Sequence, residues 1–297
     1  MCGIVGLHLR DPELHPRLGA LLAAMLCPIA ERGPDSAGVA VYGDHRRHPA
    51  GGAAVSVLDA PGDLADAVAT LLPGSPEVTV TVAGETTVLA AATTPDALTT
   101  AVRAAAPQAL VVGSGTDLTV YKGVGHPVDL ARTYGLADAV GWQGLAHTRM
   151  ATESAITAAG CHPFSVGPDQ CLVHNGSFAN HATIRRELRA EGVTFDSDND
   201  SEVAARFVAA RLAHGDDLDK ALRLLSERFD GFYTLLVTSA EGFAVVRDEI
   251  ACKPAIVAEH PRWVAMASEF RSLADLPGID EAHIFEPDPG KVHTWQR

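Results

Sequence analysis

The sequence lacks any segment typical of a membrane span or of a secretory signal. No run of about 18 uncharged apolar residues occurs in the 297-residue chain, although 47% of it is hydrophobic. The first residues, MCGIVGLHLRDPE, have no basic stretch followed by a long apolar core. We therefore expect a cytoplasmic protein with no membrane partner, long enough to bury a large core.

Positive charge is also scarce. Lys and Arg total 23 against 37 Asp and Glu, which gives a formal net charge of -14. The arginine pairs Arg46-Arg47 and Arg185-Arg186 stand isolated, and the chain has no dense basic cluster. Because an acidic protein repels phosphate backbones, we expect no nucleic-acid partner.

Motifs for metals and nucleotides are missing as well. The chain has no CxxC pair, no HExxH, no phosphate loop of the GxxxxGK type and no GxGxxG after a strand. Cys171 and His174 are close in sequence, but an i, i+3 pair on a strand points to opposite faces. The sequence therefore predicts no metal and no organic cofactor.

Cysteines are few and irregularly spaced, which argues against a disulfide framework. An odd number of them without an export signal indicates reduced thiols, at least one of which is a candidate for reactivity. They are Cys2, Cys27, Cys161, Cys171 and Cys252.

What the sequence does contain is a clear pattern of strands and helices. Two helices followed by a run of strands differ from strict βαβ alternation, so we expect one α+β domain over 1–297, with antiparallel sheets and helices outside. Residues 46–112 are expected to form an inserted lobe, with a hairpin at 78–84 and 86–94 and a helix at 96–106. The remaining strands are expected at 2–9, 37–42, 118–123, 144–152, 171–177 (ending in a tight Asn-Gly turn), 231–238, 242–247, 254–259 and 263–267, and the helices at 16–32, 180–191, 201–213 and 216–229.

Cys2 is the first candidate for chemistry. Removal of Met1 would give this thiol a free α-amine within the same residue. An α-amino group has a pKa of ~7.7–8.0, so near neutral pH part of it is unprotonated and acts as a base. The alternative is a small buried hydrophobe at the start of a strand, as many free cysteines are.

Asn175 and Gly176 are the second candidate. A side-chain amide and a backbone N–H at a tight turn can both point at one oxygen, which is what an oxyanion hole requires. The alternative is an ordinary hairpin turn of the Asn-Gly type.

Charged residues form two further candidates. Arg149, at the end of an expected strand, offers a fixed fork for a carboxylate, although most single arginines end in surface ion pairs. Asp198, Asp200 and Glu202 form an acidic cluster. The alternative is a helix cap, in which Asp200 or Ser201 caps the next helix and Glu202 complements its dipole.

Six motifs occur in the order found in class II glutamine amidotransferases, and the chain resembles that family. Its members are N-terminal-nucleophile hydrolases, so the resemblance implies a four-layer αββα sandwich. The match extends over nearly the whole chain apart from the expected insertion. The motifs are MCGIVG, RGPDSAG at 32–38, HTRMAT at 147–152, HPF at 162–164, HNGS at 174–177 and NDSE at 199–202, followed by RDEIACKP at 247–254 and ASE at 267–269.

The resemblance implies roles residue by residue. Cys2 is the implied nucleophile, with its own amine as general base, and Asn175 with the Gly176 N–H is the implied oxyanion hole. Arg149 is the implied clamp for the α-carboxylate of glutamine, and Asp200 the partner of its α-ammonium. Supporting roles are implied for His147, Thr152, Arg32 and Asp35.

A narrower resemblance is to stand-alone amidotransferase subunits related to glutamate synthase, including those of N-methylglutamate synthase. It implies glutamine as substrate, an ammonia-accepting synthase subunit as partner and hence a hetero-oligomer. Two features depart from the family: Met150, where an aromatic is frequent, and the size of the insertion. A hydrolase of another amide and a non-catalytic assembly subunit remain alternatives. The phrases that carry the match are HTRMATES, HPFSVGPDQCLVHNGS, DGFYTLLV and ACKPA.

Overall fold

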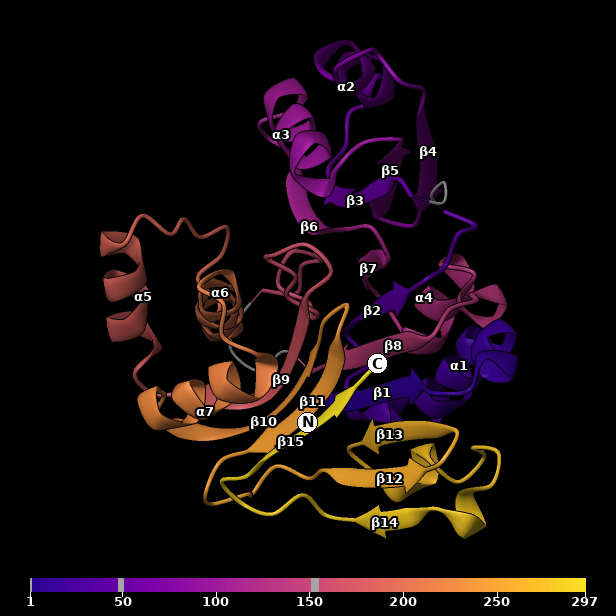
Figure 1. Cartoon of the computed structure of the whole chain (residues 1–297), viewed down its shortest axis with the longest axis vertical. Helices are drawn as coiled ribbons and strands as arrows, with labels where there is room; N and C mark the ends of the chain where they lie inside the picture. Colours follow the sequence, from indigo (N-terminus) through magenta and orange to yellow (C-terminus); the bar gives the residue numbers. More distant parts are fainter. Residues whose placement is uncertain (1, 48–50, 151–154) are drawn as a thin grey trace.

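Two antiparallel sheets stacked face to face form the centre of the molecule (Figure 1). The computed structural model describes residues 2–47, 51–150 and 155–297. The larger sheet has seven strands in the order β14-β12-β13-β1-β8-β2-β7, and the smaller has four in the order β15-β11-β10-β9. Their bounds are β1 Gly3–Leu9, β2 Ser36–Tyr42, β7 Leu118–Val124, β8 Gln143–Arg149, β9 Cys171–Phe178, β10 Gly231–Thr238, β11 Gly242–Arg247, β12 Ile256–His260, β13 Trp263–Ala267, β14 His283–Phe285 and β15 Val292–Gln296.

Helices cover both outer faces of the stacked sheets. The larger sheet carries α1 (Leu18–Ile29) and α4 (Pro127–Thr133), and the smaller carries α5 (His181–Ala190), α6 (Asp200–Ala213) and α7 (Leu218–Arg228). Three buried apolar clusters separate these layers, one between the two sheets and one beneath each set of helices. The expected α+β sandwich with αββα layers is therefore confirmed.

Strand β1 shows how alternation builds two of these layers at once. All seven of its residues are buried. Ile4 lies in the cluster between the sheets, whereas Val5 and Leu7 lie in the cluster beneath α1. Since successive side chains of a strand point to opposite faces, a central strand covered on both sides reads as a continuous apolar run.

The helix expected at 16–32 is split into three pieces. The α-helical part is α1, preceded by a 3₁₀ segment at Pro12–Arg17 and followed by another at Ala30–Arg32. Pro16 lies inside the first 3₁₀ segment. Because proline has no N–H to donate, it fits at this junction better than within the regular helix.

The expected end of the strand at Asn175-Gly176 is wrong. Strand β9 continues through both residues to Phe178 and pairs with β10 along its full length. Gly176 sits opposite Tyr233, with a φ of 151°. A Cβ at Gly176 would lie 2.0 Å from the Phe232 carbonyl oxygen, so this strand position is open only to glycine.

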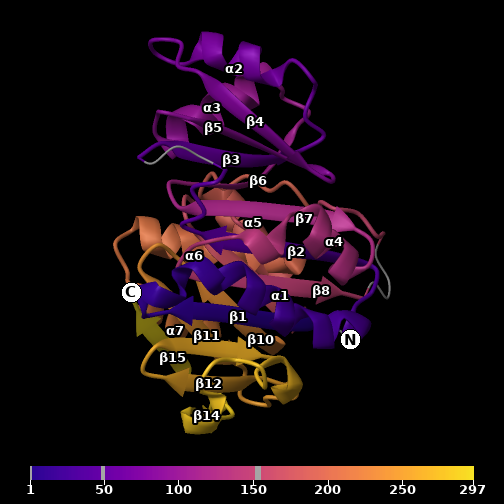
Figure 2. The ribbon, with the colours of Figure 1, turned by 90° about the vertical axis from the view of Figure 1, so that its right-hand side faces the viewer.

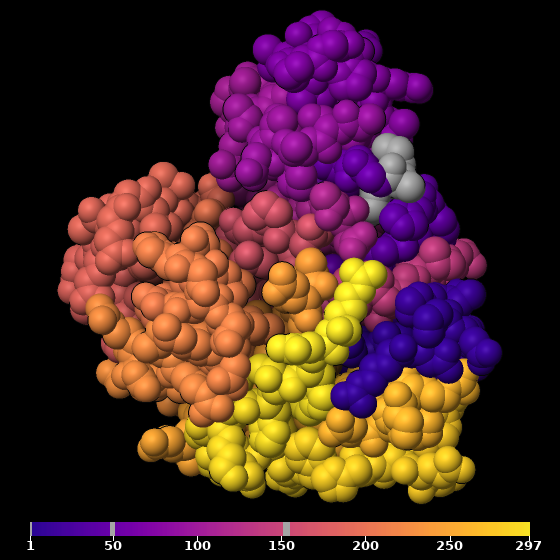
Figure 3. All heavy atoms as spheres, viewed as in Figure 1, coloured from indigo at the N-terminus to yellow at the C-terminus, as the bar shows by residue number. Residues whose placement is uncertain are grey.

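Residues 53–115 build a separate lobe that protrudes at the top of the molecule (Figure 3). Its elements are β3 (Ala53–Leu58), α2 (Leu64–Leu71), β4 (Val78–Ala83), β5 (Thr86–Ala91), α3 (Pro95–Ala105) and β6 (Leu110–Gly115). The antiparallel sheet has the order β4-β5-β3-β6, which is the βαββαβ arrangement of ferredoxin-like folds. The hairpin and α3 agree with the sequence. Strand β3 and helix α2 were not anticipated, because 43–75 showed little periodicity.

The two faces of the lobe sheet are both covered. One face packs under α2 and α3 through Val55, Leu89 and other apolar side chains. The opposite face contributes Ala54 and Ala90 to the cluster that contains Tyr121 of β7. No helix among the described residues is long and apolar enough to cross a membrane.

Candidate functional site

Cys2 lies at the entrance to β1, half-buried. The next two residues are anchored by hydroxyl groups: Thr148 Oγ1 accepts from the Gly3 N–H at 3.1 Å, and Ser268 Oγ accepts from the Ile4 N–H at 2.9 Å. Thr148 lies in β8 and Ser268 directly follows β13, the two strands on either side of β1. The two bonds fix the backbone on which the thiol is mounted.

The carbonyl oxygen of Cys2 joins the two sheets of the sandwich. It accepts from Arg32 Nε at 3.1 Å and from Asn175 Nδ2 at 3.2 Å. Arg32 is in turn held by Glu269, whose Oε1 lies 2.6 Å from its NH1 group. Burial acts to raise the pKa of Glu269, but the bond from Arg32 and the charge of Arg271 outweigh it and lower the pKa. Arg32 thus links the backbone carbonyl of Cys2 to Glu269.

Asn175 keeps a donor available. An amide nitrogen carries two N–H groups, and the bond to Cys2 uses one of them. Asn175 is 5% exposed and stands directly before Gly176 in β9. The strand therefore presents a side-chain amide and a backbone peptide in succession beside Cys2.

Arg149 is the last residue of β8, at the same end of the larger sheet as Cys2. Gly3 pairs with Thr148, so Arg149 follows directly on the partner of Gly3. Arg149 is 8% exposed, and its guanidinium donates to the Ala155 carbonyl at 3.2 Å. Asp35 donates its backbone N–H to the Arg149 carbonyl at 3.2 Å, which places the loop before β2 against this strand end.

Asp200 is the first residue of α6 and lies beside the end of β9. Its Oδ2 accepts from the Phe178 N–H at 2.9 Å. The helix cap is Asn199, whose side chain accepts from the Ser201 N–H, so the capping alternative for Asp200 or Ser201 is wrong. Asp200 is therefore held at the edge of the strand that carries Asn175.

The other two acidic residues of this cluster are occupied elsewhere. Glu202 is 2% exposed, and its two oxygens accept from the N–H groups of Asp196 and Ser197 and from Arg206. Asp198 is fully exposed, with Arg185 at 3.7 Å. The cluster that the sequence placed together thus divides into Asp200, beside the end of the strand that carries Asn175, and two residues with partners elsewhere.

His147 takes part in a buried network behind these residues. Its Nε2 lies 3.2 Å from the His174 carbonyl. Ser201 Oγ lies 3.0 Å from His162 Nε2 and 2.8 Å from His174 Nδ1. Within the described part of the chain, the second ring nitrogen of each histidine has no hydrogen-bond partner. We assign one proton to each ring, on the bonded nitrogen.

Burial fixes the neutral form of all three rings. It lowers the pKa of His147 to about 3 and that of His174 to about 4, and it lowers the pKa of His162 well below its usual range. A second proton would leave a charged N–H buried without an acceptor. The three histidines therefore form a neutral network in the interior, joined through Ser201 and the His174 carbonyl.

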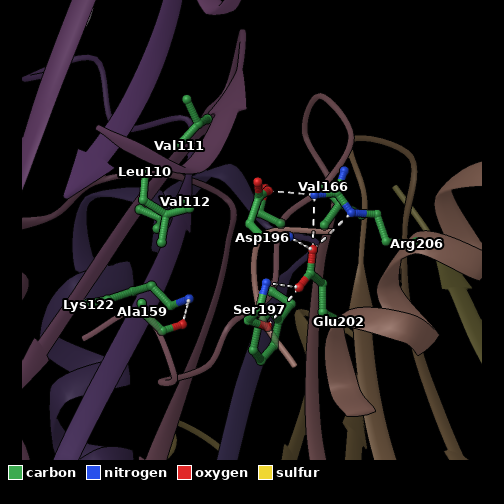
Figure 4. Close-up of a pocket in the computed structure, with 12 residues that line it drawn as sticks. Leu110, Val111, Val112, Lys122, Ala159, Val166, Asp196, Ser197, Glu202 and Arg206 are labelled. Atoms are coloured by element: carbon green, nitrogen blue, oxygen red, sulfur yellow. Dashed lines mark hydrogen bonds and ion pairs between the residues drawn. The ribbon is translucent and has the colours of Figure 1, made fainter. Parts of the chain in front are cut away.

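A small cavity lies apart from these residues, between β6, β7 and α6 (Figure 4). Lys122 faces it, 3.5 Å from the Ala159 carbonyl and 4.7 Å from the centre of the Phe164 ring. Burial lowers the pKa of Lys122 to about 8. At about 30 Å³ the cavity has room for ordered water but not for an amino acid.

Several of the contacting residues were not assigned a role from the sequence. Ser268 and Glu269 belong to the ASE motif, and Ser201 belongs to the NDSE motif. Their place in these motifs is the only feature of the sequence that could have marked them as part of the site. Their partners are more than a hundred residues away or on another element, which periodicity does not show. Thr152 lies outside the described residues. Among the residues the structure does describe, no group of His, Cys, Asp and Glu is arranged to hold a metal ion.

Comparison with known proteins decides the family. A model described as a glutamine amidotransferase domain matches residues 147–275. The chain is 47% identical to "Glutamine amidotransferase-like protein GlxB" of Rhizobium meliloti (strain 1021), over 99% of this chain and 98% of that protein. The chain belongs to the glutamine amidotransferase family. This amidotransferase is also 30% identical to a "Putative glutamine amidotransferase" of Methanothermobacter thermautotrophicus, with both chains covered in full.

Solved structures agree with the fold of this amidotransferase. The glutamine phosphoribosylpyrophosphate amidotransferase of B. subtilis superposes with a TM-score of 0.61 and 16% identity. The match covers 99% of this chain and 49% of that one. The fold is therefore that of the class II, N-terminal-nucleophile amidotransferases.

Proposed function

We propose that this amidotransferase hydrolyses glutamine to glutamate and ammonia, with Cys2 as the nucleophile after removal of Met1. The observation that carries the proposal is the meeting of Cys2 and Asn175 across the two sheets, with a hydrogen bond between them. The bond goes to the backbone carbonyl of Cys2, so it holds the Asn175 amide, with its second N–H, beside the residue that carries the thiol. Family membership supports the same chemistry.

The proposed first step is attack of the Cys2 thiolate on the side-chain carbonyl carbon of glutamine. The tetrahedral oxyanion would accept hydrogen bonds from the second N–H of Asn175 and from the Gly176 backbone N–H. The α-amine of Cys2 takes the thiol proton and passes it to the leaving ammonia. Water then hydrolyses the γ-glutamyl thioester, which releases glutamate and restores the thiol.

Binding of glutamine is proposed to use its two charges. The carboxylate pairs with Arg149 at the end of β8, and the ammonium with Asp200 at the end of β9. The bond from the Asp35 N–H to the Arg149 carbonyl fixes the end of β8, and the bond from the Phe178 N–H to the Asp200 carboxylate holds the first residue of α6 beside the end of β9. Holding both ends of the amino acid aims its amide at sulfur, and such positioning lowers barriers by several kcal/mol, of order ~7 or more in favourable cases.

The ammonia is proposed to feed a partner subunit of the glutamate-synthase or N-methylglutamate-synthase type. Support comes from the sequence phrases shared with such subunits and from a full-length relative of similar size. The hetero-oligomer, the cytoplasmic location and the status of the lobe as an insertion stay predictions. A non-catalytic assembly subunit and a hydrolase of another amide are the competing functions.

The decisive experiment combines labelling with turnover. Incubation with an electrophilic glutamine analogue, followed by mass spectrometry, is expected to place one adduct on Cys2. Cys2→Ala should abolish ammonia release from glutamine, whereas Cys27→Ala, at an exposed cysteine, should retain it. No adduct together with no ammonia release would favour the assembly role, and ammonia release by Cys2→Ala would refute the nucleophile.

The partner is tested separately. Co-expression with synthase-like subunits encoded nearby, followed by gel filtration, should yield a complex in which ammonia release from glutamine increases. Absence of association, combined with full glutaminase activity of the chain alone, would contradict the partner while leaving the hydrolase intact.

A further inference from the structure

The outermost strand of the lobe has an edge without the usual protection. Strand β4 pairs with β5, and no other strand that the structure describes pairs with its outer side. Figure 1 shows β4 at the right of the lobe, and in Figure 2 it faces the viewer. Val80 is 45% exposed and Val82 70% exposed. An exposed apolar edge is a template for pairing with another chain.

Charge is absent from this edge, although the chain carries a net charge of -14. Residues 78–84 read VTVTVAG, without a single charged side chain. Edge strand β14 is only three residues long, whereas β4 has six residues. Glu77 directly precedes β4 and Glu85 lies in the turn after it, but no charged residue interrupts the strand itself, and a charge within the strand is a common protection of an edge.

We propose that β4 pairs antiparallel with β4 of a second copy of this chain, about a two-fold axis at Val80. The sequence is self-complementary in this register. Val80 faces Val80 of the second copy, Thr79 faces Thr81, and Val78 faces Val82. Cross-strand pairs of like β-branched residues stabilise antiparallel sheets. Because the same edge of both chains is used up in an isologous contact of this kind, the assembly stops at a dimer.

Neighbouring registers are less favourable for specific reasons. A shift by one residue would set each valine opposite a threonine and turn the apolar faces of the two chains to opposite sides of the joined sheet. A two-fold at Thr81 would set Glu77 opposite Glu85, two like charges. A two-fold at Thr79 would set Pro76 opposite Val82, and proline has no N–H to give. With the axis at Val80, Glu77 faces Ala83 instead.

The dimer joins the two lobe sheets into one continuous sheet. Val78, Val80 and Val82 lie opposite Ala91, Leu89 and Thr87 in the ladder with β5. Leu89 and Ala91 belong to the cluster under α2 and α3, so the valines extend that apolar layer across the axis. No residue of the candidate site lies in the lobe, so pairing leaves each site complete in its own chain.

Sedimentation of the full chain over a range of concentrations tests the proposal. The wild type is expected to reach twice the mass of one chain. Val80→Lys and Val80→Glu should each weaken the dimer by at least about tenfold in Kd, because residue 80 faces its own like charge. An equimolar mixture of the two variants should dimerise again, since lysine then faces glutamate. Ile284→Lys, at 40% exposure on the edge strand β14, is the matched control and should leave the dimer intact.

Other outcomes overturn the pairing. A wild type that stays monomeric at high concentration refutes it, and so does a dimer that persists in both charge variants. Failure of the mixed variants to reassociate refutes the register at Val80. If the wild type is a monomer that binds a synthase subunit and Val80→Lys does not bind it, the self-pairing is refuted and β4 is instead the contact surface for that partner. Each readout is a mass, so it is independent of glutaminase activity.

Discussion

At the residue scale, the proposed function depends on a few polar groups, and the structure defines their partners. Cys2 is held through its carbonyl by Arg32 and Asn175, and through the next two peptides by Thr148 and Ser268. The thiol itself takes no part in these contacts. A single-residue change can therefore remove chemistry without removing the anchors.

Asn175→Ala is expected to lower kcat for glutamine hydrolysis by ~100- to 1000-fold, because one oxyanion donor is lost. The KM should change little, since the proposed contact forms mainly in the transition state. Steady-state ammonia release measures both parameters. Asn180→Ala, near the start of α5, serves as the control. A fall in folding stability large enough to explain the lost rate would contradict the assignment.

Asp200→Asn is expected to raise KM for glutamine by ~10- to 100-fold, because a bond to a charged ammonium is weakened. An asparagine oxygen still accepts from the Phe178 N–H, so the strand end should keep its structure. Asp198→Asn is the matched control, because Asp198 is exposed two residues earlier. Equal KM values for the two variants would rule out Asp200 as the ammonium partner.

At the element scale, close approach of backbone segments explains where glycine is required. A Cβ on Gly38 of β2 would lie 2.0 Å from the His162 carbonyl oxygen. That position sits between Lys122 of β7 and His147 of β8 in the ladder. Gly38 thus lets the loop with His162 pack directly on the sheet behind the site.

Gly38→Ala is expected to lower the free energy of unfolding by ~1–3 kcal/mol, because the added methyl overpacks against backbone that cannot rotate away. Denaturant unfolding of both proteins measures the difference. Gly62→Ala is the control, since nothing lies within 4 Å of its added Cβ. Identical unfolding midpoints for Gly38→Ala and the wild type would show that the loop is displaced at no cost.

At the scale of the whole molecule, three neutral histidines lie buried between the sheets and α6. Burial lowers the pKa of His147 to about 3 and that of His174 to about 4, and it lowers the pKa of His162 well below its usual range. An unfolded histidine titrates near ~6.5. Below that pH the unfolded chain binds more protons than the folded one, so stability is present above ~6.5 and is lost as the pH falls toward the folded values.

Stability should therefore fall on acidification, by roughly 1 kcal/mol per histidine between about pH 7 and about pH 5.5. Urea unfolding at several pH values gives the slope. His162→Asn should reduce the slope even though it lowers stability itself, whereas exposed His214→Gln should leave the slope unchanged. A wild-type midpoint that is independent of pH over this range would contradict the buried neutral network.

Much of this architecture was readable from the sequence. Continuous apolar runs predicted the buried strands β1 and β2, and apolar spacing at i, i+3 and i+4 predicted α1, because burial imposes those periods directly. The ordered motifs also named Cys2, Arg149, Asn175 and Asp200 as candidates. The lobe was only half anticipated, since β3 and α2 lie in a segment rich in Gly, Pro, Asp and Ala.

The sequence by itself determined the layered fold class and named the candidate residues for the chemistry, because pattern and motif are local properties. Only the tertiary structure decided that β9 runs through Gly176, since the glycine is required by the carbonyl of a neighbouring strand. It also decided that Asp200 holds the end of β9 while Asn199 caps α6. These outcomes depend on contacts between segments distant in sequence, and no single stretch of the chain encodes them.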